Sequence, residues 1–336
     1  MSKVLVLGAT GYLGRALCLA LLRSGNHTVY GLARSERKAR LLASQEIIPV
    51  VGSVAESATW LDLVREKHID VVVDCSGAGG DSARVLRDVV AVGRERVEKY
   101  IRDGDGGRGA KLAFVYTSGT WVHGSSDSSV NDLEAVGTGG GKPEPPSLVK
   151  WRVGMEREVL AARKVLDVVV VRPALLYGRE HDIWASFFGP VVAAAKAGAE
   201  IVRVPFREAS LPGLCHVDDA ARGLQRAVEK VALIAGTGVY PVFDLVSSVE
   251  SMRVIFDAAA RVLGFEGKVE LVGAGEDEAF AEAVQTSFNG SSGKAKQILG
   301  WEPKRIGFAA RMEVYARAFV AAQQLQEAAA AAGNAA

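Results

Sequence analysis

Three glycines, each three residues after the last, follow the first apolar segment of the chain. Gly8, Gly11 and Gly14 lie between the strand-like run 4–7 and a helix-like segment that begins at Arg15. The first glycine permits a tight turn, the second lets backbone approach a pyrophosphate, and the third lets the helix pack on the strand. The N–H groups and positive dipole end of that helix attract phosphates. The pattern predicts dinucleotide binding; the alternative is an ordinary glycine turn in an α/β protein without a ligand.

The second strand-like segment, 27–33, ends where a dinucleotide site usually holds the adenosine ribose, roughly 20 residues past the glycine turn. An NAD site places a carboxylate there, but this chain has Arg34, followed by Arg37 and Lys38. A guanidinium matches a phosphate in fork geometry, and the missing carboxylate removes repulsion. The sequence therefore favours NADP over NAD. The alternative is that these three cations form the solvated start of a helix.

The rest of the sequence predicts the strands and helices that surround this turn. Apolar, β-branched runs predict strands of a buried parallel sheet, at residues 4–7, 27–33, 46–52, 69–75, 112–118 and 168–173. Helices are expected at 81–101, 151–164 and 250–263, with another beginning in 214–220 and a short basic one at 292–299. The alanine-rich end, 321–336, is either a fraying helix or disordered.

Composition narrows the class of protein. The 336 residues are 49% hydrophobic and carry a net charge of +1, so nothing indicates nucleic acid or a membrane surface as a partner. No apolar run is long enough to cross a bilayer. Cys18, Cys75 and Cys215 show no zinc-type spacing, and the histidines show no metal-ligand spacing, so no metal is expected. We expect a reduced, cytoplasmic protein with a small-molecule substrate.

Four segments together, 8–14, 172–178, 216–221 and 294–303, resemble the extended short-chain dehydrogenase/reductase family of NAD(P)-dependent epimerases, dehydratases and reductases. The resemblance implies an α/β fold with a Rossmann-like, doubly wound parallel sheet and a smaller C-terminal substrate lobe. It also implies a ligand crevice at the carboxyl ends of the strands, and it allows a homodimer. The expected division is a dinucleotide-binding domain at 1–178, to which 216–247 returns, a substrate lobe at 179–215 and 248–320, and an alanine-rich tail at 321–336.

The resemblance also assigns residues to the crevice. For the cofactor these are Gly8, Thr10, Gly11, Tyr12, Leu13, Gly14, Arg34, Arg37, Cys75, Ser76, Thr117 and Pro173. For the substrate pocket they are Gly119, Trp121, Trp151, Met155, Tyr177 and His181. For Cys75 a small buried thiol is the simpler interpretation.

One departure from the family pattern concerns the chemistry itself. The family uses a Tyr-x-x-x-Lys pair on a helix and a Ser or Thr after the fifth strand, but here Trp151, Met155 and Gly119 occupy those positions. Neither an indole nor a thioether can replace a phenol and an ammonium in proton transfer. Loss of such help typically slows a reaction about 10²–10⁴-fold. Trp151 and Met155, one helical turn apart, are expected to form an apolar wall.

Three residues are candidates to replace the pair. Ser118 is the nearest remaining hydroxyl, His123 stands where the family often has tyrosine, and His216 precedes a helix beside the substrate lobe. Each has a structural alternative: a backbone-bonded hydroxyl at a strand end, a packed histidine, and a hydrogen bond at a helix start.

Three functions remain open. The first is an NADP-dependent oxidoreductase or epimerase-like enzyme with a rebuilt proton-transfer site. The second is a redox-silent NADP(H)-binding protein that acts as a sensor or binds a partner. The third is a non-redox lyase or isomerase that uses the same crevice.

Overall fold

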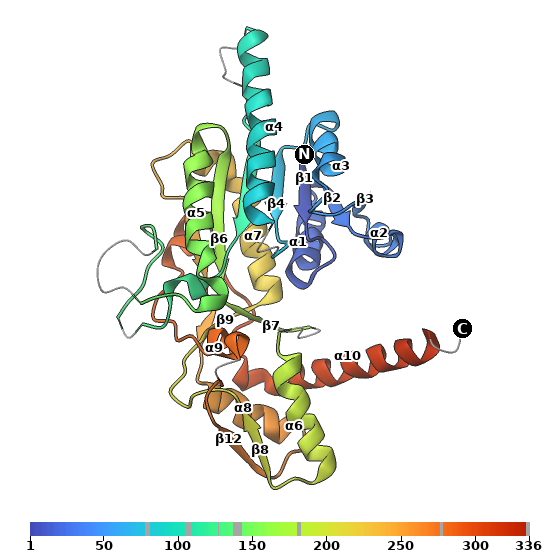
Figure 1. Cartoon of the computed structure of the whole chain (residues 1–336), viewed down its shortest axis with the longest axis vertical. Coiled ribbons are helices and arrows are strands. Elements are labelled where there is room, and N and C mark those ends of the chain that lie inside the picture. Colours follow the sequence, from blue (N-terminus) through green and yellow to red (C-terminus); the bar gives the residue numbers. More distant parts are fainter. Residues whose placement is uncertain are drawn as a thin grey trace.

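A seven-stranded parallel sheet forms the centre of the larger part of the molecule (Figure 1). The structure, a computed structural model, describes residues 1–77, 81–104, 109–126, 128–136, 143–179, 183–275 and 278–333. The strand order is β10-β6-β5-β4-β1-β2-β3. The strands are β1 (Ser2–Leu7), β2 (His27–Ala33), β3 (Ile48–Val51), β4 (Val71–Asp74), β5 (Ala113–Thr117), β6 (Asp167–Pro173) and β10 (Val242–Leu245). The expected doubly wound parallel sheet is confirmed.

Helices cover both faces of this sheet because its strands are apolar on both sides. One face packs against α1 (Tyr12–Arg23), α2 (Glu36–Ala43) and α7 (Val217–Ala235). The other packs against α3 (Ser57–Glu66), α4 (Ser82–Arg102) and α5 (Trp151–Ala161). Along β1, for example, Val4 and Val6 enter the first core and Leu5 and Leu7 the second, as the strand period of two requires.

A smaller lobe lies below the sheet in Figure 1 and has an aromatic core of its own. Trp184, Phe188, Phe256 and Phe308 are fully buried there, with Phe308 and Trp184 ring centroids 4.8 Å apart. Two small sheets belong to this part of the fold: β7 (Leu175–Tyr177) with β9 (Gly213–His216) and β11 (Ser248–Val249), and β8 (Ile201–Val204) with β12 (Lys268–Leu271). Its helices are α6 (Ala185–Ala197), α8 (Met252–Val262), α9 (Ala279–Val284) and α10 (Met312–Gly333).

Two segments differ from the sequence expectations, and a third resolves an open alternative. Residues 214–216 belong to strand β9, so the helix expected from 214 begins only at Val217, after His216 in extended backbone. The short helix expected at 292–299 is a single π-helical turn over Ala295–Leu299, ended by Gly300 in left-handed backbone. The alanine-rich end continues α10 as far as Gly333, and Figure 1 shows this helix projecting from the lobe. Among the described helices, none is both long and apolar enough to span a membrane.

A buried arginine joins three elements at the carboxyl end of β6. Arg172 is fully buried and donates to both carboxylate oxygens of Glu156 on α5, at 3.0 and 2.6 Å. Its Nη1 lies 3.4 Å from Asp244 Oδ1 on β10, and Asp244 Oδ2 lies 2.8 Å from His123 Nε2. Electrostatic attraction and hydrogen bonds from its neighbours His123 and Arg172 overcome the effect of burial and hold the pKa of Asp244 below its usual value. These charges are paired, as buried charges must be.

We predict that Glu156→Gln lowers the free energy of unfolding by about 3–5 kcal/mol, because it leaves part of the Arg172 charge uncompensated in the interior. Urea denaturation followed by circular dichroism measures this change. Glu158→Gln, which changes an exposed glutamate on the same helix, serves as the matched control and should cost less than about 0.5 kcal/mol. Equal midpoints for the two variants would contradict the structural role of the buried pair.

Candidate functional site

The glycine turn after β1 brings three backbone segments into close contact. Gly8 has a φ of +80°, and a Cβ placed on it would lie 2.6 Å from the carbonyl oxygen of Cys75. A Cβ on Gly14 would collide with the carbonyl of Gly8. The N–H of Gly11 donates to the Gly8 carbonyl at 2.9 Å and closes the turn. The absence of side chains at Gly8 and Gly14 therefore allows α1 to begin directly against β1 and the end of β4.

A pocket of about 450 Å³ opens beside this turn, at the carboxyl ends of β4, β5 and β6. This edge of a doubly wound sheet is where such folds bind ligands. The lining residues are Gly11, Tyr12, Leu13, Cys75, Ser76, Gly77, Thr117, Ser118, Gly119, Thr120, Trp121, Val149, Arg152, Pro173, Ala174, Leu175, Leu176 and Ile183.

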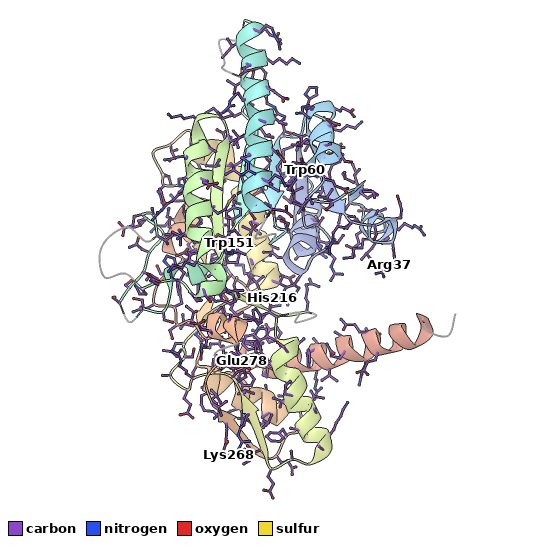
Figure 2. The ribbon with its side chains drawn as sticks, viewed as in Figure 1. Arg37, Trp60, Trp151, His216, Lys268 and Glu278 are labelled. Carbon is purple, nitrogen blue, oxygen red and sulfur yellow. The ribbon has the colours of Figure 1, made fainter. Side chains whose placement is uncertain are left out.

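The residues predicted for the cofactor fall into three groups. Seven line the pocket: Gly11, Tyr12, Leu13, Cys75, Ser76, Thr117 and Pro173. Gly8, Thr10 and Gly14 belong to the turn behind it. Arg34 and Arg37 are exposed at the end of β2 and the start of α2, where neither forms an ion pair within the described part of the chain. Figure 2 shows Arg37 at the outer edge of the molecule.

The thiol of Cys75 is a packing group in this pocket. Its Sγ lies 3.3 Å from Thr117 Oγ1, and burial raises the pKa of Cys75 to about 12. The side chain therefore remains a protonated thiol at neutral pH. Because a nucleophilic cysteine needs a lowered pKa, this environment does not suit a nucleophile.

Arg152 is the charged residue that the sequence analysis missed. Of the described residues around the pocket, it alone carries a formal charge. Its Nη1 donates to the carbonyl oxygen of Thr117 at 3.1 Å, and its guanidinium carbon lies 4.9 Å from the ring centroid of Trp151. A cation in the first turn of α5 faces the positive end of the helix dipole, which is unfavourable. An arginine at this unfavourable position of a predicted helix was the signal in the sequence that could have identified Arg152 as a functional residue.

The apolar wall expected from Trp151 and Met155 is not found at the pocket. Met155 is only 4% exposed and packs between α5 and the sheet, because it shares a helix face with the buried Val159. Trp151 is 37% exposed, and its Nε1 donates to the carbonyl of Leu148 at 3.2 Å. The apolar side of the pocket instead comes from residues of other elements: Trp121, Leu175, Leu176 and Ile183.

Ser118 lies where hydroxyl chemistry was expected. Its backbone N–H donates to the carbonyl of Val171 at 2.8 Å, which ties the residue to the end of β6. Its Oγ is buried and has no hydrogen-bond partner among the described residues. Gly119 and Thr120 continue the pocket wall beside it. A buried hydroxyl without a partner costs about 1–3 kcal/mol, and Ser118 carries such a group at the wall of the pocket.

His123 lies apart from this pocket, in the buried network around Arg172. Besides its bond to Asp244, its ring packs edge-on against Phe288 at 5.9 Å, and it borders a separate cavity of about 200 Å³. The structure thus places it with Asp244, in the position of a packed and hydrogen-bonded histidine.

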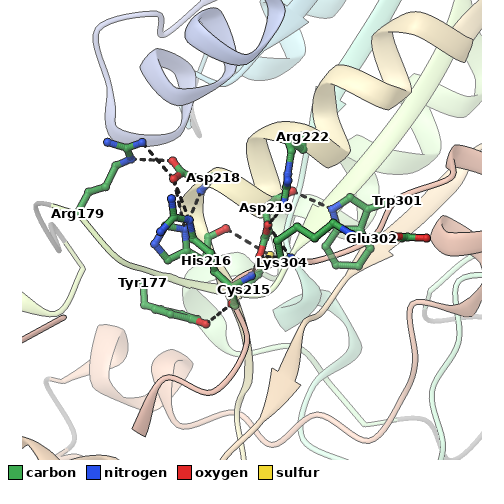
Figure 3. Close-up of polar contacts among 11 residues, drawn as sticks. Tyr177, Arg179, Cys215, His216, Asp218, Asp219, Arg222, Trp301, Glu302 and Lys304 are labelled. Atoms are coloured by element: carbon green, nitrogen blue, oxygen red, sulfur yellow. Dashed lines mark hydrogen bonds and ion pairs between the residues drawn. The ribbon is translucent and has the colours of Figure 1, made fainter. Parts of the chain in front are cut away.

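His216 and Tyr177 lie between the sheet and the lobe (Figures 2 and 3). His216 Nδ1 accepts from the N–H of Asp218 at 3.1 Å and caps α7, and burial lowers the pKa of His216 to about 4. The hydroxyl of Tyr177 donates to the carbonyl of Arg305 at 2.6 Å within the lobe core. Neither residue lines the pocket formed by the described residues. His181 lies outside the described residues.

The described residues contain no group of three or more His, Cys, Asp or Glu side chains that could hold a metal ion. The polar side chains that line the pocket, beside the backbone of the glycine turn, are the hydroxyls of Tyr12, Ser76, Thr117, Ser118 and Thr120, the thiol of Cys75 and the guanidinium of Arg152. This set suits an anionic ligand at the turn and a substrate oxygen near Arg152.

The sequence model described as the NAD dependent epimerase/dehydratase family matches residues 4–242. No curated protein matches the sequence significantly.

Solved structures share the fold over nearly the whole chain. A dTDP-glucose 4,6-dehydratase from Bacillus anthracis in complex with NAD is 16% identical, with a TM-score of 0.69 over 95% of this chain and 96% of that one. A UDP-glucuronic acid 4-epimerase from Bacillus cereus, in complex with UDP-glucuronic acid and NAD, is 17% identical, with a TM-score of 0.65 over 96% and 99%. A UDP-glucose 4-epimerase from Thermotoga maritima with UDP-glucose is 17% identical, with a TM-score of 0.63 over 94% and 98%.

We predict that His216 makes stability fall in acid. Because its pKa is about 4 in the folded state and about 6.5 when unfolded, the unfolded chain binds the proton first. Stability is therefore lost as pH falls from about 6.5 towards 4, by up to about 1.4 kcal/mol per pH unit. Urea denaturation at pH 7 and pH 5 measures this loss, which should be smaller in His216→Asn, a substitution that retains a capping acceptor.

His68→Asn is the control, since His68 is exposed and its φ of 50° is one that asparagine tolerates. It should leave the pH dependence as in the wild type. Parallel pH profiles for the wild type and His216→Asn would contradict the effect of burial on His216.

Proposed function

Because the chain belongs to the NAD dependent epimerase/dehydratase family, we propose that it is an NADP-dependent oxidoreductase or epimerase-like enzyme acting on a small carbonyl or hydroxyl substrate. One observation carries this proposal: the glycine turn and the guanidinium of Arg152 border the same pocket of about 450 Å³. A phosphate-binding turn and a cation thus meet at the carboxyl edge of the sheet.

The turn fits a dinucleotide. Gly8 and Gly14 let α1 begin directly against β1 and the end of β4, and Gly11, Tyr12 and Leu13 at the start of α1 line the pocket. The N–H groups at a helix N-terminus attract phosphate. Arg34 and Arg37 would then hold the 2′-phosphate of NADP, since guanidinium groups bind phosphate well and the end of β2 carries no carboxylate. The Bacillus proteins named above are in complex with NAD, so the preference for NADP rests on these arginines alone.

When bound, the nicotinamide ring accepts or donates a hydride. The chain's own residues have three tasks in such a reaction. Arg152 attracts the substrate oxygen and stabilises negative charge that develops on it, a contribution typically worth about 10²–10³ in kcat. Ser118, Thr117 and Thr120 offer hydroxyls for hydrogen bonds to the same oxygen or to the ribose. Trp121, Leu175 and Leu176 exclude water, which strengthens the attraction to Arg152.

A second candidate function follows from the missing Tyr-x-x-x-Lys pair. Because Met155 is buried in the core and Trp151 is bonded to Leu148, α5 presents no acid or base to the pocket. A redox-silent NADP(H)-binding protein would have these features. It would bind NADPH tightly and consume none with any carbonyl compound.

We predict that the protein binds NADPH more tightly than NADH, as measured by titration of nicotinamide fluorescence. Arg34→Gln should weaken NADPH binding about tenfold and leave NADH binding unchanged, because it removes a charge-assisted contact to the 2′-phosphate. Arg40→Gln removes an exposed arginine elsewhere on α2 and should change neither affinity. Equal affinity of the wild type for the two nucleotides would contradict the preference for NADP.

We predict that Arg152→Gln lowers kcat about 10²–10³-fold, with Arg152→Lys intermediate because it keeps the charge and loses the fork geometry. One assay follows NADPH consumption with simple aldehydes and ketones. A second assay uses chromatography to detect conversion of UDP-glucose, or of UDP-glucuronic acid, into its epimer. Arg157→Gln, on the same helix but bonded to Val136 outside the pocket, is the control. An unchanged kcat in Arg152→Gln would remove Arg152 from the mechanism.

A further inference from the structure

A second concave surface lies on the outer side of α1 and α7. It has a volume of about 540 Å³, and Lys304, Arg305 and Arg311 contribute to its lining from the segment 304–311. Small side chains from the two helices, Ala16, Ala20 and Ala221, form part of its lining. The pocket beside the glycine turn shares none of its lining residues. We call this surface the cationic cleft, after its charged lining residues: Arg23, Arg222, Lys304, Arg305 and Arg311.

The cations of this cleft outnumber the carboxylates available to them. Asp218 is the one acidic residue in the described lining, and Arg179 already binds both of its oxygens, at 2.6 and 3.0 Å. Arg305 shares the same carboxylate at 3.2 Å. Lys304 pairs with Glu302 at 2.7 Å and Arg222 pairs with Asp219, so among the described residues the cations of the cleft without a carboxylate partner are Arg23 and Arg311.

Three guanidinium groups in the cleft keep unused donors. Neither Arg23 nor Arg311 has an ion pair or a side-chain hydrogen bond within the described ranges, and both are exposed. Arg222 binds Asp219 through Nη2, while its Nε is buried and has no acceptor among the described residues. A buried donor without an acceptor is costly, but the Arg222 side chain as a whole is 40% exposed, so the outer part of its guanidinium is open to a ligand in the cleft.

The segment that carries Lys304 and Arg305 is hydrogen-bonded to Asp219 on α7 (Figure 3). The carboxylate of Asp219 is fully buried and accepts from the N–H groups of Lys304, at 3.0 Å, and Arg305, at 2.7 Å. Trp301 Nε1 donates to the carbonyl oxygen of Asp219 at 2.8 Å. The cationic side chains therefore project from a fixed backbone, which reduces the entropy lost when they bind a ligand.

We propose that the cationic cleft binds a small molecule that carries a diphosphate group, at a site separate from the glycine turn. Guanidinium groups pair with phosphate oxygens in a planar, two-bond geometry, and several of them match a group with several negative charges. The volume lies within the range of small-molecule sites, and a concave surface suits a compact ligand better than a flat membrane. The proposal does not depend on the redox function of the other pocket.

Isothermal titration calorimetry with inorganic pyrophosphate and with ADP tests the site, using the full-length protein. Arg23→Gln/Arg311→Gln should weaken the binding of both probes at least tenfold, because it removes two unpaired guanidinium groups from the cleft. Arg94→Gln/Arg102→Gln, which removes two exposed arginines from α4, is the matched control for charge and should bind both probes as the wild type does. An equal loss in the two variants, or no binding by the wild type, would overturn the proposal.

Two further measurements locate the ligand. NADPH affinity should be the same in Arg23→Gln/Arg311→Gln as in the wild type; a parallel loss would mean that the probes had occupied the dinucleotide site and would overturn the second site. Co-sedimentation with vesicles of phosphatidylcholine and phosphatidylinositol 4-phosphate tests a lipid headgroup as the source of phosphate. We expect none, and co-sedimentation that the double variant abolishes would overturn the assignment to a soluble ligand.

Discussion

The buried guanidinium of Arg172 constrains the whole region around the pocket. A fully buried cation must be paired, since desolvation otherwise costs more than the fold can supply. Here Glu156 on α5 and Asp244 on β10 provide the pairing, and this fixes a helix and a neighbouring strand to the end of β6. Pro173, the next residue, lines the pocket, and the first turn of the same α5 carries Arg152. The positions of Pro173 and Arg152 at the pocket therefore depend on one set of buried ion pairs.

Two departures from local helix and packing rules lie at this pocket. Arg152 places a cation at the unfavourable end of a helix dipole, and Ser118 buries a hydroxyl without a partner among the described residues. Elsewhere along α5 the rules are followed: Met155 and Val159 share the buried face. Natural sequences depart from local rules mainly at functional sites. The combination supports the pocket as the working site of the protein.

The sequence predicted what depends on neighbours along the chain. The glycine turn, six of the seven strands of the main sheet and the start of α5 at Trp151 follow from short patterns, and the structure agrees with them. The lobe depends on distant pairing instead: β7 pairs with β9 some forty residues later, and β9 with β11. Residue type also says nothing of the direction of a side chain, so the sequence left both a chemical and a structural role open for His123 and His216, which the structure places in buried positions.

Ion pairing separates the roles of arginines that look alike in sequence. Arg172 has its guanidinium matched by two carboxylates in the interior and is fully buried, so it stabilises the fold. Arg152 has a carbonyl and an aromatic ring as partners, and it faces a cavity. Arg23 and Arg311 have no acidic partner in the described part of the chain and border another cavity. Charge left unpaired at a concave surface is available to a ligand of opposite charge, whereas charge paired in the core is not. This difference assigns Arg172 to structure, Arg152 to the pocket beside the glycine turn, and Arg23 and Arg311 to the cationic cleft.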